Sequence, residues 1–262
     1  MKTKLGASIL LCTALAVVSF ANEDLDTVFD WNFTAAEGWE GDSWQEVAEA
    51  GFAVAFERLE QVSDESRNAR VYVDARPGYE RLRIRIPANE KGLGRGQPVL
   101  TYAFPESARP ALHGKLSFEA GLTGTDSQSA AIELRSGHSV LLSINLRTGT
   151  PRVFRHSGID DDEVRTAFDA PSSSVYAPMR NRWQKYELTW TVSPDGTNSN
   201  ATLWVEHGDG GDAPLSVSGV PFRLNGVPDN LRMNVAWPTY GGGAQDREKG
   251  MYLNSLKLET GR

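Results

Sequence analysis

The 262-residue chain contains a single cysteine and only four histidines, and it has no long apolar run beyond its first residues. One cysteine cannot form an intrachain disulfide, so the core must be stable without a covalent cross-link. The histidines show no H-x-x-x-H or related ligand spacing, which argues against a transition-metal site. We expect no cofactor. A structural calcium stays open, because Asp24, Asp26 and Asp30 offer oxygen donors near the first predicted strand.

The first residues have the pattern of an export signal. Lys2 and Lys4 precede an apolar run over 9–18 that is too short to span a membrane. Ser19 and Ala21 supply small side chains at the −3 and −1 positions of a cleavage site. The sequence therefore predicts a signal peptide over 1–21, a single domain over 22–262 without a membrane span, and a secreted or periplasmic location.

The chain also has a shortage of positive charge. Its formal net charge is −7, and loss of Lys2 and Lys4 with the signal would make it −9. An acidic protein is repelled by nucleic acid and by anionic membrane surfaces, so we expect neither as a partner. The residues give no reason to expect an oligomer, and we predict a monomer.

Two-residue alternation of apolar and polar side chains dominates the rest of the sequence. Turn-forming segments such as "RPGY", "SPDGTNSN" and "HGDGGDAP" separate the alternating runs. Only 46–50 and 160–168 favour helical turns. The sequence predicts strands over 28–33, 52–59, 70–76, 79–87, 98–104, 114–122, 129–135, 139–147, 151–155, 183–192, 200–207, 214–222, 231–237 and 250–259.

Many short strands without βα alternation indicate an all-β fold, namely an antiparallel β-sandwich of the jelly-roll type with two sheets. The parity of two strands identifies candidate core residues. These are Tyr186, Leu188, Trp190 and Val192 in one strand, and Leu231, Met233, Val235 and Trp237 in the other.

The C-terminal third runs "RWQKYELTWTV", a turn, "ATLWVEH", "LRMNVAWPTYGGG" and finally "MYLNSLKLE". Together with the opening "FDWNFTAAEGWEGDSW", this succession resembles the concanavalin A-like jelly roll of secreted laminin G-like and glucanase-like domains. The resemblance implies two curved sheets, with the first and last strands side by side. It also implies a concave face of the kind that commonly receives a polysaccharide.

Several polar side chains share the parity opposite to the apolar ones. A half-solvated antiparallel sheet gives such a pattern without any function. However, arginine and asparagine suit the hydroxyls and carboxylates of sugars, and an aromatic ring among polar neighbours favours sugar stacking. Trp204 would be that ring, unless it packs under a long loop such as 157–181. The predicted ligand-binding residues are Arg81, Arg83, Arg85, Arg135, Asn145, Trp204 and Asn234.

We therefore expect an exported module that binds a polysaccharide or another glycan on one shared face, the concave face of a sheet. The alternative is a carbohydrate-active enzyme of the same fold, a glycoside hydrolase or polysaccharide lyase. Glu119 and Glu133 could pair across neighbouring strands as the two carboxylates of a hydrolase, and Tyr240 could be the base of a lyase. No E-x-D-x-x-E run occurs, and neither do the Q-I-H and Y-F-K-A-G strands of jelly-roll alginate lyases. A structural or adhesion module is the third possibility.

Overall fold

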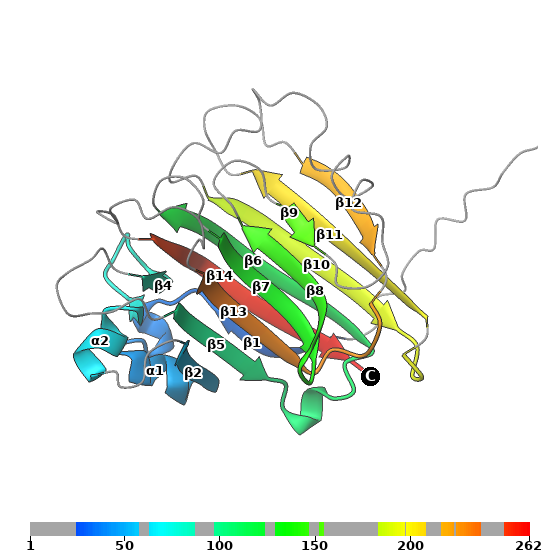
Figure 1. Cartoon of the computed structure of the whole chain (residues 1–262), viewed down its shortest axis with the longest axis horizontal. Helices are drawn as coiled ribbons and strands as arrows, with labels where there is room; N and C mark the ends of the chain where they lie inside the picture. Colours follow the sequence, from blue (N-terminus) through cyan, green and yellow to red (C-terminus); the bar gives the residue numbers. More distant parts are fainter. Residues whose placement is uncertain are drawn as a thin grey trace, which may run out of the picture.

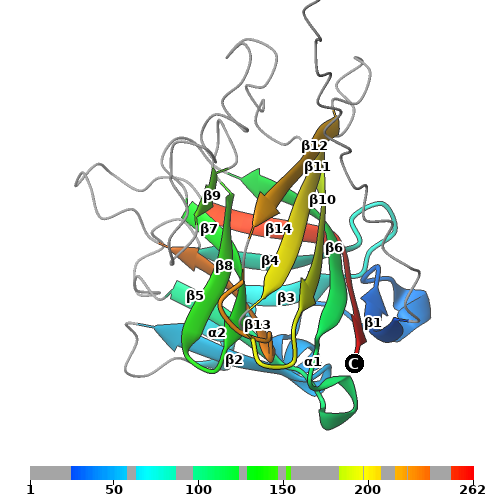
Figure 2. The same cartoon turned by 90° about the vertical axis from the view of Figure 1, so that its right-hand side faces the viewer.

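The protein is a sandwich of two antiparallel sheets, which Figure 1 shows from the front and Figure 2 from the side. The computed structural model describes residues 25–57, 63–86, 97–123, 129–146, 152–154, 183–196, 198–207, 216–222, 224–236 and 249–262. The predicted signal peptide, the loop over 157–181 and the helix over 160–168 lie outside these residues. The described residues include fourteen strands, which are divided between the two sheets and account for most of the described chain.

The eight-stranded sheet has the order β12-β11-β10-β6-β14-β4-β3, and β1 also pairs with β14. Its strands are β1 (Asp26–Trp31), β3 (Val71–Asp74), β4 (Arg81–Ile86), β6 (His113–Thr123), β10 (Gln184–Val192), β11 (Ser199–His207), β12 (Ser216–Phe222) and β14 (Lys249–Gly261). The pairing of β1 with β14 joins the first and last strands, as the resemblance to concanavalin A-like domains implies.

The six-stranded sheet has the order β2-β5-β13-β7-β8-β9. Its strands are β2 (Phe52–Glu57), β5 (Gln97–Ala103), β7 (Ser129–Ser136), β8 (Ser139–Leu146), β9 (Arg152–Phe154) and β13 (Asn230–Ala236). The predicted all-β antiparallel sandwich is thus confirmed, and so is each of the predicted strands. Their ends deviate by at most about two residues, the usual uncertainty of strand and helix boundaries.

Helices are short and lie at one edge of the sandwich. The helix α1 (Trp44–Glu49) begins after Ser43, whose hydroxyl accepts a hydrogen bond from the backbone of Gln45, and it confirms the turn predicted over 46–50. It contacts both β2 and β3, so it bridges the edges of the two sheets. The 3-10 turns η1 (Ala35–Glu37) and η2 (Glu106–Ala108) are additional. No described helix is long and apolar enough to cross a membrane.

The sequence prediction missed the helix α2 (Asp64–Asn68). Ser63 caps its N-terminus by accepting a hydrogen bond from the backbone of Ser66, and two acidic residues follow in the first turn. This is a recognisable helix start, but five residues are too few to give a period of 3.6.

The long strand β14 determines how the eight-stranded sheet is assembled. One edge of β14 pairs with β6 along its length, while the other edge pairs first with β4 and then with β1. Its register shifts between Leu253 and Ser255. The extra residue resets the alternation, so Leu253 and Leu256 both point into the core although they are three positions apart.

The core lies between the sheets and is apolar. The predicted core residues of β10 are all buried, and so are Leu231, Met233 and Val235 of β13, whereas Trp237 lies outside the described residues. Near β1, Phe29 stacks on Trp31 with a ring separation of 4.2 Å. Because the inner faces hold nearly all the large apolar side chains, the polar alternates must lie on the two outer faces.

A close contact in the core gives a test of the fold. A Cβ atom at Gly114 of β6 would lie 2.1 Å from Cζ2 of Trp190, whose indole is fixed by donating to the Ala111 carbonyl at 3.0 Å. We expect Gly114→Ala to lower the free energy of unfolding by roughly 1–3 kcal/mol through overpacking. Urea denaturation measures this, with Ser117→Ala on the outward face of the same strand as a control that changes it by less than about 0.5 kcal/mol.

Candidate functional site

The predicted ligand-binding residues divide between the two outer faces of the sandwich, so they do not form one surface. Arg135, Asn145 and Asn234 belong to β7, β8 and β13 of the six-stranded sheet. The remaining residues, Arg81, Arg83, Arg85 and Trp204, belong to β4 and β11 of the eight-stranded sheet. The expectation of one shared binding face is therefore wrong, because strand parity fixes a side chain's face within its own sheet but not the sheet itself.

On the six-stranded sheet, the carboxylate of Glu133 lies between two guanidinium groups. Its Oε2 atom is 3.3 Å from Nη1 of Arg232 and 3.5 Å from Nη1 of Arg135. The three side chains are only 12%, 21% and 17% exposed, in the order Glu133, Arg232, Arg135. Arg135 also donates a hydrogen bond from Nη2 to the His138 carbonyl. The two guanidinium groups thus share the Glu133 carboxylate in a largely enclosed position.

Cross-strand register explains why these residues meet. Arg232 pairs directly with Glu133, and Arg135 follows Glu133 by two residues on β7. Asn234 lies in the adjacent row of β13, opposite Ala131. We call Arg232, Glu133, Arg135 and Asn234 the Glu133 cluster. Ala131 also pairs with Asn145 on β8, so the backbone of Asn145, another predicted ligand-binding residue, adjoins the cluster. The side chain of Asn145 lies outside the described atoms.

On the eight-stranded sheet, Arg81, Arg83 and Arg85 of β4 form a row that we call the arginine ladder, and its central member Arg83 contacts a buried carboxylate. Asp74, which is 2% exposed, accepts hydrogen bonds at 2.7 Å from both Nε and Nη2 of Arg76. It also accepts one at 2.5 Å from Nη2 of Arg83. The hydrogen bonds from Arg76 and the charge of Arg83 lower the pKa of Asp74 from 3.8 to about 2, although burial acts in the opposite direction. Asp74 is therefore ionised at neutral pH, and it orients both guanidinium groups.

Aromatic rings alternate with the arginines of the ladder. Arg85 and Arg83 lie over Tyr72, with 5.1 Å and 5.6 Å between the guanidinium carbon and the ring centroid. Arg83 and Arg81 lie over Tyr252 at 5.1 Å and 5.9 Å. Cation–π contacts of this kind hold both partners in place. Arg81 also lies over the ring of Trp183. We call these arginines and rings the arginine–aromatic strip, and its members are Tyr72, Arg81, Arg83, Arg85, Trp183 and Tyr252.

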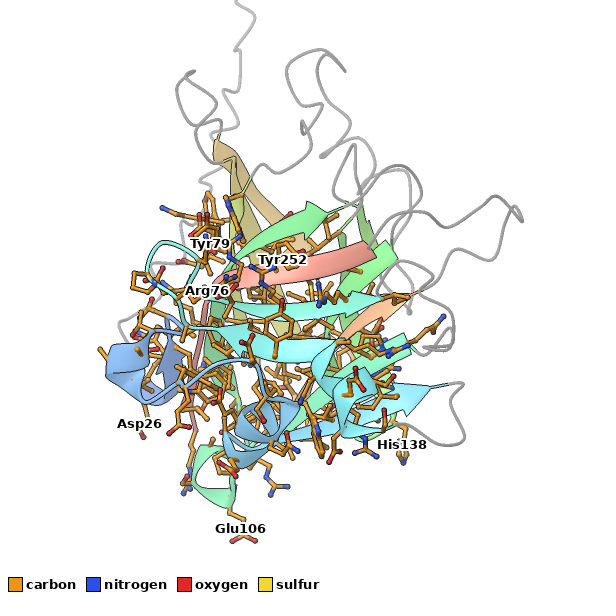
Figure 3. The ribbon with its side chains drawn as sticks, turned by 90° about the vertical axis from the view of Figure 1, so that its left-hand side faces the viewer. Asp26, Arg76, Tyr79, Glu106, His138 and Tyr252 are labelled. Carbon is orange, nitrogen blue, oxygen red and sulfur yellow. The ribbon has the colours of Figure 1, made fainter. Side chains whose placement is uncertain are left out.

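The strip follows one row across the sheet. Tyr72 pairs with Arg83, Arg83 with Tyr252, and Tyr252 with Gly121 of β6. A Cβ atom at Gly121 would lie 3.1 Å from Cε3 of Trp183, so the glycine lets this indole approach the β6 backbone closely. Figure 3 shows this side of the molecule, with Tyr252 labelled on it. Four strand spacings separate β3 from β10, which gives the strip a length of about 19 Å.

The catalytic candidates are not brought together. Glu119 is on β6 of the eight-stranded sheet and Glu133 on β7 of the six-stranded sheet, so they lie on opposite outer faces. The expected pairing of these two carboxylates is wrong, because β6 and β7 follow each other in sequence but belong to different sheets. Tyr240 lies outside the described residues. Trp204 is 44% exposed on β11, opposite Glu187, and is not part of the strip as defined.

Within the described ranges, no group of three or more His, Cys, Asp or Glu side chains is arranged to hold a metal ion. Of the three aspartates considered for calcium, Asp24 lies outside those ranges, Asp26 is exposed, and Asp30 pairs with Lys257 at 3.6 Å.

Sequence reasoning named the arginine ladder but missed the aromatic members of the strip and its anchor, Asp74. Tyr72 alternates with the apolar Val71 and Val73, so parity alone could have placed its ring on the outer face. Tyr252 was harder to assign, because the register shift in β14 reverses the parity of the residues that follow it.

No protein-family model matches the chain, and no curated protein matches it. Several solved structures are similar at low identity. An alginate lyase from Corynebacterium sp. is 7% identical with a TM-score of 0.46, and the match covers 80% of this chain and 94% of that chain. Lectin I-B4 from Griffonia simplicifolia is 9% identical with a TM-score of 0.39, covering 84% and 98%. A sialidase is 10% identical with a TM-score of 0.44, covering 72% of this chain but only 16% of its own.

The enclosed carboxylate of the Glu133 cluster predicts a stability effect. Glu133→Ala leaves two largely buried guanidiniums facing each other without their shared anion, so we expect the free energy of unfolding to fall by about 1–3 kcal/mol. The control is Glu187→Ala, which breaks a more exposed pair with Lys115 and should change the free energy by less than about 1 kcal/mol. Equal losses in urea denaturation would contradict the enclosed position of Glu133.

The low pKa of Asp74 predicts a loss of stability in acid. A carboxyl whose pKa is lower in the folded than in the unfolded state stabilises the fold above about pH 4, and this contribution disappears as the pH falls toward about 2. We expect Asp74→Asn to reduce stability at pH 6 more than at pH 2.5, as measured by urea midpoints at each pH. As a control, Asp30→Asn removes a half-exposed carboxylate that pairs with one lysine, and it should reduce the stability at pH 6 by less than Asp74→Asn does. If the urea midpoints of Asp74→Asn and of the parent protein change with pH in the same way, the low pKa assigned to Asp74 is refuted.

Proposed function

We propose that this protein is a non-catalytic glycan-binding module, and that the Glu133 cluster of the six-stranded sheet is its binding surface. The observation that carries the proposal is the position of Arg135 and Arg232 around a single carboxylate, that of Glu133, which pairs across the strands with Arg232 and precedes Arg135 by two residues. Polar residues on a half-solvated sheet are ordinary, but an enclosed group of this composition requires desolvation of three charges. A ligand that forms hydrogen bonds with these charged side chains would explain why the sheet carries them despite this desolvation cost.

The chemistry of the cluster suits a sugar chain. Guanidinium groups present several N–H donors in one plane and can bind a carboxylate or a pair of hydroxyl oxygens through two parallel contacts. The amide of Asn234 adds both a donor and an acceptor in the next row. Because Glu133 already holds both arginines in place, less side-chain entropy is lost when a glycan binds.

The physiological setting forms part of the proposal. An exported protein meets extracellular or cell-wall polysaccharides, and the N-terminal sequence predicts such export. We propose that the domain over 22–262 acts as a monomer in this setting, with the glycan as its partner.

Removal of the guanidinium groups tests the proposal. We expect Arg135→Gln and Arg232→Gln each to weaken binding to the preferred polysaccharide by about tenfold or more, since hydrogen bonds from charged groups contribute about 1.5–3 kcal/mol. Affinity electrophoresis through gels that contain neutral glucan, xylan, pectate or alginate identifies the ligand and measures the effect. Lys115→Gln removes a cation from the opposite face and should leave binding unchanged.

Unfolding midpoints of the same variants show whether a loss of binding reflects a loss of fold. A folded double variant of Arg135 and Arg232 that retains binding to every polysaccharide of the panel would exclude the Glu133 cluster as the binding surface. Release of reducing ends or of unsaturated uronate by the parent protein, abolished by Glu133→Gln, would instead establish the enzymatic alternative and overturn the non-catalytic proposal.

A further inference from the structure

Arg81 of β4 is enclosed by three aromatic rings that come from different parts of the chain. Its guanidinium carbon lies 5.6 Å from the ring centroid of Tyr79, 5.3 Å from that of Trp183 and 5.9 Å from that of Tyr252. Its Nε donates a hydrogen bond of 2.9 Å to the Tyr79 carbonyl. Among the described residues, neither of its terminal nitrogens donates a hydrogen bond or forms an ion pair. The hydrogen bond from Nε therefore orients the guanidinium group, and its terminal N–H groups can donate to a ligand.

Tyr79 provides an exposed and rigid flat surface beside this guanidinium. Its side chain is 54% exposed, although large apolar residues are normally covered. Its backbone nitrogen donates to the Arg76 carbonyl at 2.8 Å, which closes a turn, and the Arg76 guanidinium lies 5.2 Å from its ring centroid. Arg76 and Arg81 thus both contact the ring. Figure 3 shows Tyr79, Arg76 and Tyr252 on the same side of the molecule.

The charge of this region is opposite to that of the whole chain. Arg76, Arg81 and Arg83 lie near the carboxylate of Asp74, and the charge of Asp42 also acts on Arg76. These five groups sum to 3 − 2 = +1, in a protein whose net charge is −7. Like charges at such separations repel each other, so the strip costs stability in the free protein. An anion bound beside Arg81 would relieve part of this repulsion.

From these contacts we propose that Tyr79, Trp183 and Tyr252 around Arg81 form a second glycan-binding site, specific for an anionic sugar residue. The Arg81 guanidinium binds the carboxylate or sulfate, and the Tyr79 ring stacks on the apolar face of the sugar. The remaining arginines of the strip attract the charged units that follow along the polysaccharide. The site lies on the opposite sheet from the Glu133 cluster and does not depend on the function proposed for that cluster.

An anionic polysaccharide fits these features better than other polyanions. Nucleic-acid binding depends on many successive phosphate contacts over a broadly basic surface, which a protein of net charge −7 does not offer. A single guanidinium beside an exposed ring instead matches one anionic sugar unit. A neutral glycan would use the rings but would gain nothing from the arginines. Uronates and sulfated sugars share the required combination of one anionic group and one apolar ring face, and they differ in the geometry of the anion.

The test uses the Arg135→Gln, Arg232→Gln double variant as the parent, so that binding at the Glu133 cluster does not contribute. We expect this protein still to bind alginate or carrageenan, but not dextran. Alginate carries only carboxylates and carrageenan only sulfates, so the comparison distinguishes a carboxylate site from a sulfate site. We expect Arg81→Gln to weaken this binding about tenfold. Tyr79→Ala, at an exposed position with little effect on folding, should weaken it about three- to tenfold.

A matched control separates this site from general attraction of anions. Arg109→Gln removes the same charge at an exposed position outside the strip and should bind as the parent does. The proposal is overturned if Arg109→Gln weakens binding as much as Arg81→Gln, if Tyr79→Ala has no effect, or if no anionic polysaccharide binds to the double variant. If Arg135→Gln and Arg232→Gln fail to weaken binding, only the function proposed for the Glu133 cluster is contradicted.

Discussion

The constraint on which this structure depends is that successive side chains of a strand point to opposite faces of its sheet. In a sandwich of two sheets, one set of alternate side chains forms the shared core and the other set forms two separate outer surfaces. The core holds Leu82, Ile84 and Leu134 almost without exposure, and this burial fixes where Arg83 and Glu133 must point. Both candidate surfaces are consequences of the packing between them.

The two surfaces differ in how they hold arginine. In the Glu133 cluster, one carboxylate lies between two guanidiniums that come from neighbouring strands. In the arginine–aromatic strip, Asp74 accepts a hydrogen bond from Arg83, and the rings of Tyr72 and Tyr252 contact the arginine side chains. The first arrangement presents hydrogen-bond donors from a small enclosed group. The second presents flat rings and charge along a row of the sheet, which suits a linear ligand.

Local sequence determines strands well, because apolar alternation and turn residues are properties of neighbouring positions. The sequence therefore predicts the strands, the core of β10 and the outward direction of Arg81, Arg83 and Arg135. It does not determine which strands become neighbours. Glu119 and Glu133 are close in sequence, yet β6 and β7 join different sheets; Tyr72 and Tyr252 are distant, yet the register of β4 places them on either side of Arg83. A register shift such as that of β14 adds a change of parity that the amino-acid pattern conceals.

The central claim is that this sandwich carries two independent glycan-binding faces. An NMR titration of the isotopically labelled protein with a uronate oligosaccharide tests it most directly, by following the backbone amides of both sheets. The account predicts two separate groups of shifting amides, one on β7 and β13 and the other on β4 and the beginnings of β10 and β14, with different affinities. Shifts confined to the loops or edges, with neither group responding, would contradict it.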